Sequence, residues 1–558
     1  MNNTQNSTDN SRKVHLRKRD ASGAPSAAHR KLQPSSVAIL AVSALLYGIA
    51  STLPLYAQYA LTFPLWVLAC VGISGVAFVI ITAFYKASLR MRGFVRTASD
   101  EGVPKSSVRR VFLLSFALIE LAFLFALLSN YPGLCSPDSN ATLSQVNGQD
   151  YYSDSNRYEG LTNAHPIFYT FLIWLVFKGT AFLGSQEASL FVFMFLQITF
   201  VAAALAWCVS WLARTGARKG YVAGALAFVV LSPVIAAHVI ILWKDIPFAA
   251  VLLLLTVHLT EYRGRVKPTI KQLVVLGTLL LFVSIFRNNG YYVALFTVAF
   301  MIVFQTGLRK QLLAVAAVLV LLMSLFQGPI QSALSISKGH FAESVGIPLQ
   351  QLAATVVAEG EIDSHDQEVL EEILPLQEWA DSYNPSTSNP IKQNVLFNDD
   401  YLDNHKGEFL GVWARTLTKN FSTYVRAWVL ETYGYWQPGY STWIGRLTET
   451  ANDTPAKDFF GIGYKPQFIA NAFLTLLPAF FGMGSLIWFS LVALVLSVSF
   501  VRGWKRKVKA LTPYIPALGL LGTLLIAAPI VSDYRYIFAL YLVIPFLPQI
   551  VALGRETK

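Results

Sequence analysis

The chain of 558 residues carries few charged side chains. Asp, Glu, Lys and Arg make up only 14% of it, whereas soluble domains average about 25%. Cysteine is also scarce. The three residues, Cys70, Cys135 and Cys208, stand far apart and form no CxxC pair. These shortages exclude a soluble enzyme and a disulfide-stapled secreted module, and they give no indication of a zinc site.

Long apolar runs are what the sequence has instead. A helix that crosses a bilayer needs about 20 mostly apolar residues, and twelve stretches reach or approach that length. They cover residues 36–56, 64–85, 111–129, 187–212, 221–240, 246–260, 270–286, 291–306, 311–327, 480–501, 511–530 and 536–553. The sequence therefore predicts an all-α polytopic membrane protein with about twelve transmembrane helices.

One further apolar stretch, residues 166–183, is ambiguous because Pro166 opens it and Lys178 interrupts it. The positive-inside rule decides its status. If it does not span, the predicted cytoplasmic segments hold 30 of the 44 Lys and Arg residues. If it did span, the later basic loops would all lie outside. We therefore predict an interfacial helix here and place both termini in the cytoplasm.

The net charge of +12 then reflects topology and attraction to anionic lipid head groups, not binding of nucleic acid. The same topology divides the chain into five parts. These are a disordered basic cytoplasmic tail (1–34), two N-terminal transmembrane helices with a basic loop (35–110), a transmembrane core (111–327) whose first external loop is 130–186, a large extracytoplasmic insert (328–479), and the C-terminal transmembrane helices (480–558).

Side chains of both charge signs stand at the predicted external ends of the helices. A carboxylate there can act as general base for an acceptor hydroxyl, and cations can stabilise a departing phosphate. The sequence supplies both kinds of group from separate segments. The candidates are Asp138, His165, Lys244, Asp245, Arg287, Asn288, Arg535 and Tyr536.

The motif around His165 carries a family resemblance. A loop acid followed by Asn163-Ala164-His165-Pro166 resembles the GT-C glycosyltransferases, which include protein O-mannosyltransferases and aminoarabinose transferases. Their stretch commonly reads HPPL, and Ile167 stands here in place of the second proline. The likeness runs from about residue 111 to the C-terminus. Asp245 matches an acid at the start of a span, and a late RY-and-proline signature is matched by Arg535, Tyr536 and Pro545.

The combination of YPGxxSxDS, NxHPxxYT, LWKD, FRNNG, IPLQQ and YNP also resembles an uncharacterised family of large membrane proteins from Gram-positive bacteria. Together these resemblances imply a GT-C-like core in a bacterial plasma membrane. They imply transfer of a sugar from a polyprenyl-phosphate donor to an envelope glycan or another extracytoplasmic acceptor, with membrane lipids as further partners.

In that hypothesis Asp138 is the general base and Asp245 orients the acceptor or a cation. Donor or acceptor contacts are assigned to His165, Lys244, Arg287, Asn288, Arg535 and Tyr536. No ligand spacing indicates a metal, although the cofactor, including a divalent ion, stays open.

Each candidate also has a structural interpretation. Asp138 suits a turn after Pro137, Lys244-Asp245 suits a local ion pair, His165 suits a helix cap, and Arg287 suits snorkelling to lipid head groups. Two other functions stay open as well. One is a flippase or transporter of lipid-linked sugars, for which Glu120 is the intramembrane charge, and the other is a scaffold that docks partners on the insert.

Overall fold

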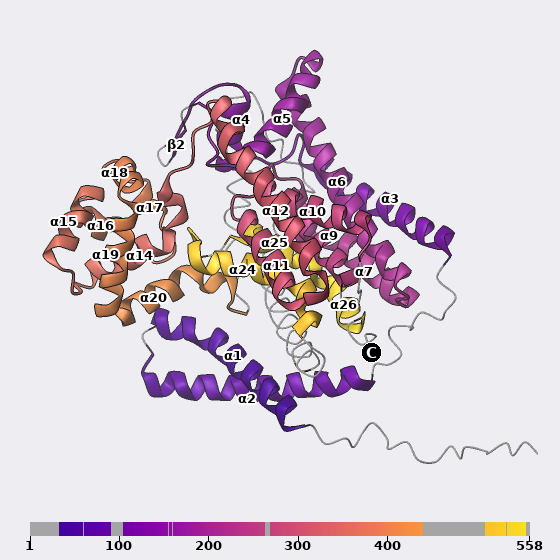
Figure 1. The fold of residues 1–558 in the computed structure, drawn as a ribbon, viewed down its shortest axis with the longest axis horizontal. Coiled ribbons are helices and arrows are strands. Elements are labelled where there is room, and N and C mark those ends of the chain that lie inside the picture. Colours follow the sequence, from indigo (N-terminus) through magenta and orange to yellow (C-terminus); the bar gives the residue numbers. More distant parts are fainter. Residues whose placement is uncertain are drawn as a thin grey trace, which may run out of the picture.

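A computed structural model describes residues 33–59, 61–90, 104–153, 156–158, 160–262, 268–438, 501, 508–531 and 533–553. Most of this part is helical (Figure 1). Its strands form a small antiparallel hairpin of β1 (Tyr151–Ser153) and β2 (Asn156–Tyr158). The prediction of a helical membrane protein is confirmed, because several of these helices are apolar over a membrane-spanning length.

Seven helices of the described part are long and apolar enough to cross a membrane. They are α1 (Pro34–Tyr59), α2 (Phe63–Arg90), α3 (Lys105–Ser129), α6 (Gln186–Arg214), α9 (Asp245–Leu259) with the turn η3 (Thr260–Tyr262), α12 (Arg309–Leu325) with its continuation through α13 (Gln331–Ala333), and α25 (Tyr534–Val543) with α26 (Leu547–Leu553). A bent pair, α7 (Lys219–Leu231) and α8 (Pro233–Val239), makes an eighth if it counts as one span.

Three further predicted spans coincide with shorter apolar helices. These are α10 (Ile270–Phe286), α11 (Gly290–Phe304) and α24 (Ile515–Ala527). The predicted span 480–501 lies almost entirely outside the described residues. Length and composition therefore support seven or eight spans, and the count of twelve stays a prediction.

The predicted span 221–240 is not one straight helix, because α7 and α8 meet at a bend of 53°. Pro233 causes the break, since its ring removes a backbone donor and clashes with the preceding turn. Ser232 then caps the second helix, accepting a hydrogen bond from the Ile235 N–H at 3.4 Å. The chain leaves α8 in an extended stretch that leads into the candidate site.

Helix α9 lies at the centre of the helical core. It packs against α6, α10, α24 and α25, and nearly all of its residues are buried, among them Phe248 and Leu252. A helix that is apolar all round is expected to be buried on all sides. This position holds the N-terminus of α9, with Asp245 as its first residue, in the interior of the protein.

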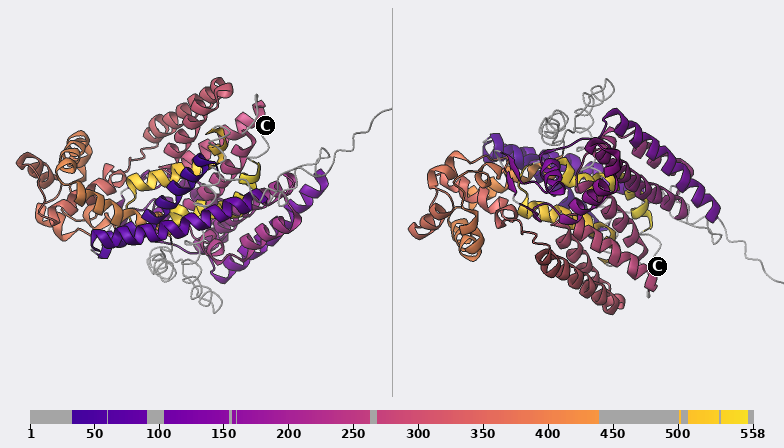
Figure 2. Two further views of the ribbon diagram at one scale, coloured as in Figure 1. Left: turned by 90° about the horizontal axis from the view of Figure 1, so that it is seen from below. Right: turned by 90° about the horizontal axis from the view of Figure 1, so that it is seen from above.

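The insert forms a separate set of short helices. They are α14 (Gly346–Val357), α15 (Ser364–Ile373), α16 (Leu376–Asp381), α17 (Asn389–Lys392), α18 (Asp399–Asn404), α19 (Lys406–Lys419) and α20 (Phe421–Thr432). Their own hydrophobic core includes Leu349, Trp379 and Phe409. The insert lies at the opposite end of the molecule from α26 and from the start of α3, and Figure 2 shows the same separation in two further views.

Candidate active site

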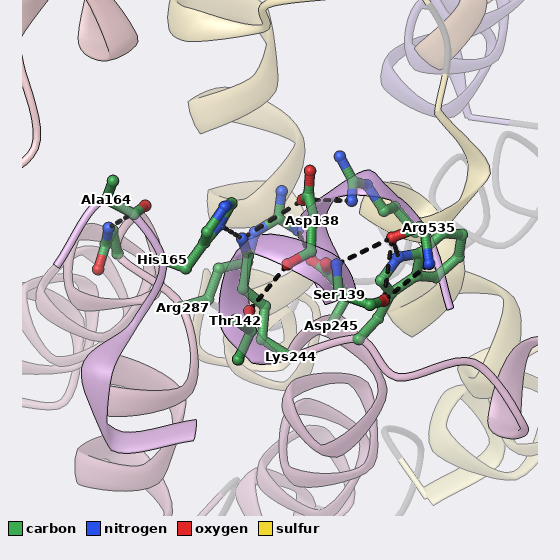
Figure 3. Close-up of polar contacts among 12 residues, drawn as sticks. Asp138, Ser139, Thr142, Ala164, His165, Lys244, Asp245, Arg287 and Arg535 are labelled. Carbon is green, nitrogen blue, oxygen red and sulfur yellow. Dashed lines mark hydrogen bonds and ion pairs between the residues drawn. The ribbon is translucent and has the colours of Figure 1, made fainter. Parts of the chain in front are cut away.

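Charged residues from separate segments meet at one place in the structure (Figure 3). We call this group the charged cluster. It contains Asp138, His165, Lys244, Asp245, Arg287, Asp533 and Arg535. They come from α4 (Pro137–Val146), the residues before α5 (Ile167–Gly179), the start of α9, the turn between α10 and α11, and the start of α25.

Asp138 lies in the first turn of α4, where a carboxylate is favoured by the helix dipole. A capping box fixes this helix start, because Ser136 and Ser139 exchange side-chain and backbone hydrogen bonds. The Ser139 hydroxyl also donates to the Leu242 carbonyl at 2.8 Å. The Trp243 indole N–H donates to the Ser136 hydroxyl at 2.6 Å. These bonds bring the start of α4 against the segment that leads into α9.

Two cations contact the same oxygen of Asp138. The Arg535 guanidinium lies 2.6 Å from Oδ2 and the Lys244 ammonium lies 3.6 Å from it. Burial acts to raise the pKa of Asp138, but Arg535 and Lys244 outweigh burial and hold that pKa well below its usual range. The carboxylate is therefore ionised, and its side chain is still 31% exposed.

His165 contacts Lys244 through its Nδ1 atom, at 2.5 Å from Nζ. Burial and the Lys244 charge lower the pKa of His165 to about 4. The imidazole is therefore neutral at pH 7, with Nδ1 as the acceptor from the ammonium group and the proton on Nε2. Burial also lowers the pKa of Lys244, an effect that the Asp138 charge opposes.

The backbone before α5 places His165 at the cluster. The Asn163 side chain caps α5, since its Oδ1 accepts from the Ile167 N–H at 3.1 Å. The side chain of Asn288 donates to the Asn163 carbonyl at 3.0 Å and to the Ala164 carbonyl at 3.4 Å. The His165 loop is thus held by the turn between α10 and α11.

The second ion pair of the cluster is more deeply buried. Arg287 Nη1 lies 3.0 Å from Asp245 Oδ1, with side-chain exposures of 9% and 1%. The guanidinium also lies over the Tyr536 ring, 4.4 Å from its centroid, which adds a cation–π attraction. Gly290 permits the tight turn after Arg287, because a Cβ atom there would collide with the Val283 carbonyl of α10.

Arg535 joins Asp138 to a second carboxylate. Its Nε atom lies 2.6 Å from Asp533 Oδ2, and its Nη2 donates to the Tyr536 hydroxyl at 3.0 Å. The guanidinium also lies over the Trp243 ring, 5.2 Å from the centroid. Arg535 therefore has two carboxylate partners, Asp138 and Asp533, and two aromatic neighbours.

The structure brings the predicted site residues close together, but Asn288 does not take part in the ion pairs. Asn288 bonds to the backbone before His165, so it holds the loop instead of touching the ion pairs. Lys244 and Asp245 do not form the local pair considered from sequence. Lys244 contacts Asp138, and Asp245 contacts Arg287.

Two other structural interpretations are also wrong in detail. Asp138 belongs to a helix rather than to a turn, and Asn163 rather than His165 caps α5. Pro545, matched in the late signature, accepts from the Tyr221 hydroxyl through its carbonyl and is not one of the cluster's partners.

Sequence reasoning missed Asp533, Trp243 and Ser136. Asp533 had a signal, because an Asp directly before an apolar helix is a favoured N-cap, and its side chain does accept from the Arg535 N–H at 3.2 Å. Ser136 likewise precedes a proline at the start of a helix. Over the described residues, no group of three or more His, Cys, Asp or Glu side chains is arranged to hold a metal ion.

The fold and the site define a class: a helical membrane protein with a cluster of ion pairs assembled from its loops and helix ends. The chain belongs to the family of unknown function DUF6020, whose model matches residues 155–558. The matched range includes all predicted site residues except Asp138. Comparison with the curated proteins and with the solved structures gives no match.

Acidification will destabilise the wild-type protein more than a His165→Gln variant. The unfolded chain takes up a proton on histidine below about pH 6.5, whereas folded His165 does so only near pH 4. Stability from this residue is therefore present above pH 6.5 and is lost as pH falls toward 4, by about 2 kcal/mol at pH 5. Melting curves at pH 7 and pH 5 measure the difference. Equal losses in both proteins would contradict a neutral His165.

Proposed function

We propose that this protein is an integral-membrane glycosyltransferase. It moves a sugar from a polyprenyl-phosphate donor to an envelope glycan or another extracytoplasmic acceptor. One observation carries the proposal: a partly exposed carboxylate, Asp138, lies in contact with two cations from other segments. Glycosyl transfer from a lipid phosphate needs this combination, with a base for the acceptor and positive charge for the leaving phosphate.

The reaction is a single inverting displacement. The acceptor oxygen attacks the anomeric carbon as the bond from that carbon to the phosphate oxygen breaks. The acceptor proton passes to Asp138, and the electron pair of the broken bond stays on the phosphate. Arg535 and Lys244 hold that phosphate, and Arg287, buried against Asp245, supports the site from behind.

The two cations explain how the base becomes active. While Arg535 and Lys244 contact Oδ2 of Asp138, the pKa of the carboxyl is low and it is a weak base. A donor phosphate binds the same two cations and shares their charge. The pKa of Asp138 then rises toward its ordinary range, so the base gains strength only when the donor is present.

Charge is conserved within the site during this step. Before transfer, Asp138 is negative and the donor phosphodiester carries one negative charge. After transfer, Asp138 is protonated and the phosphate monoester carries two. Arg535 contacts both Asp138 and the buried Asp533. When the negative charge moves from Asp138 to the phosphate, Arg535 pairs with the phosphate while its contact with Asp533 keeps it in the site.

The finer topology belongs to the same proposal. We place twelve spans and a GT-C-like core in a bacterial plasma membrane, with both termini in the cytoplasm. Support comes from the apolar helices that coincide with eleven of the twelve predicted stretches. The position of the insert, at the opposite end of the molecule from α26, is also consistent with it.

The test is the lipid-linked sugar pool of a deletion strain. We expect one polyprenyl-phosphate monosaccharide to accumulate when the gene is deleted and to fall again when the wild type is restored. Sealed vesicles then separate transfer from transport, because a transferase consumes the donor without moving it across the membrane. An unchanged pool would remove the proposal, and accumulation of intact donor inside the vesicles would favour a flippase.

A further inference from the structure

The insert carries an ion pair of its own beside the charged cluster. Lys392 Nζ, at the end of α17, lies 2.7 Å from Oε2 of Glu343, which belongs to the short helix η6 (Phe341–Ser344). The lysine side chain is 4% exposed, whereas that of Glu343 is 52% exposed. The carboxylate is therefore fixed from behind by a buried cation while its outer side faces solvent.

Backbone contacts join the segment before this pair to the loop that carries His165. The Ser337 N–H donates to the Leu161 carbonyl at 2.8 Å, and the Asn163 N–H donates to the Ser337 carbonyl at 2.9 Å. Two residues later, the backbones of Gly339 and Ala164 pack closely, since a Cβ on Gly339 would lie 3.2 Å from the Ala164 Cα. The start of the insert and the His165 loop are thus one connected layer.

Glu343 and the charged cluster also act on each other electrostatically. The Glu343 charge acts on the ionisation of His165, and the Asp138 charge acts on that of Glu343. Burial would raise the pKa of Glu343, but Lys392 outweighs burial and lowers it. Glu343 is therefore ionised at neutral pH and lies within the electrostatic field of the candidate base.

The surroundings of Glu343 on the insert are acidic. Asp399 and Asp403 lie on α18, and Asp403 contacts both His340 Nδ1 at 2.9 Å and the Phe341 N–H at 2.9 Å. The charges of Glu343 and Asp403 act on the ionisation of Asp399. The charges of Asp399 and Asp403 act on that of His340. The insert thus places the carboxylates of Glu343, Asp399 and Asp403 on its side of the site, whereas the cations of the charged cluster are balanced by its own three carboxylates.

We propose that Glu343 positions the acceptor, and that the acceptor is an uncharged carbohydrate. Its hydroxyl groups donate to the Glu343 carboxylate, which holds the reacting hydroxyl near Asp138. An ionised carboxylate is a strong acceptor for such bonds. A phosphate-rich or carboxylated glycan would instead meet like charge, which is costly at a close contact. This inference rests on the proposed glycosyl transfer.

The experiment uses the full-length protein in liposomes. The donor is the radiolabelled polyprenyl-phosphate sugar that accumulates in the deletion strain. The acceptors are envelope glycans of that strain, separated by anion exchange into an uncharged and an anionic fraction. We expect label in the uncharged fraction. Glu343→Gln will raise the acceptor KM about tenfold, the loss expected for one charge-assisted hydrogen bond, and will leave the donor KM unchanged.

Two further variants make the outcome decisive. Glu361→Gln is the matched control, because Glu361 also pairs with a lysine on the insert, Lys419 at 3.0 Å, but is not among the groups that act on His165 or Asp138. If Glu343→Gln is poorly folded by its melting curve, Glu343→Asp keeps the charge and should raise the acceptor KM by a smaller factor.

The results separate two failures. An unchanged acceptor KM in a folded Glu343 variant, or an equal rise in Glu361→Gln, would overturn the role of Glu343. Label in the anionic fraction would overturn the inferred acceptor. A wild-type protein that consumes no lipid-linked donor with either fraction would remove the proposed function itself, and the role of Glu343 with it.

Discussion

Replacing Asp138 with Asn will lower kcat for sugar transfer by about a thousandfold, within the range that a positioned general base supplies. The amide keeps the shape of the side chain but cannot take the acceptor proton. The protein should still fold, because Arg535 retains its contact with Asp533 at 2.6 Å. Lys244, which loses its carboxylate partner, keeps its contact with His165 Nδ1.

The measurement is single-turnover transfer in liposomes, with donor binding followed separately. Donor affinity should rise slightly or stay the same in Asp138→Asn, because the carboxylate no longer competes with the phosphate for Arg535 and Lys244. Asp150→Asn is the matched control. Asp150 lies in the same loop and accepts from the Gly160 N–H at 2.8 Å, a bond that the Asn oxygen also makes. Full activity in Asp138→Asn would exclude the proposed base.

The membership of the charged cluster could largely be predicted from sequence, because topology alone restricts it. The predicted topology places these residues at one membrane face, and it therefore predicts that their polar side chains lie near one another. Asp138, Lys244 and Arg535 do meet in the structure. The positions of the helices could also be predicted from sequence, since an apolar run of spanning length can form few other structures in a membrane.

The pairing inside the cluster could not be predicted. Lys244 and Asp245 are adjacent in sequence, yet each contacts a different residue from another segment. That choice depends on the bend after Ser232, which sets the direction in which the chain enters α9. It also depends on the rotation of each helix about its axis, which sequence periodicity leaves open when a helix is apolar on every side.

The hydrophobic core of the insert could not be predicted from sequence for another reason. Its helices are between 4 and 14 residues long, and helices of that length are marginal without tertiary packing. Trp379 and Phe409 bury themselves against segments far away in the chain. The place of Glu343 beside His165 follows from that packing, so its role could be inferred only from the structure.

Breaking the buried ion pair will have the largest effect on stability. Asp245→Asn leaves the Arg287 guanidinium buried without its carboxylate partner, and removal of one member of such a pair costs about 3–5 kcal/mol. The side-chain exposures of 1% and 9% support a value in that range, because water has little access to the remaining charge. The Tyr536 ring offsets only part of the loss, since a cation–π contact contributes about 1–2 kcal/mol and is already present.

The double variant Asp245→Asn with Arg287→Met separates charge from packing. Because it removes both charges, most of the lost stability should return, and a coupling energy well above 1 kcal/mol should result from the double-mutant cycle. Unfolding midpoints in a detergent titration measure all four proteins. Additive losses would show that Asp245 and Arg287 act independently. They would leave Arg287 free to serve the donor phosphate directly, which the buried pair argues against.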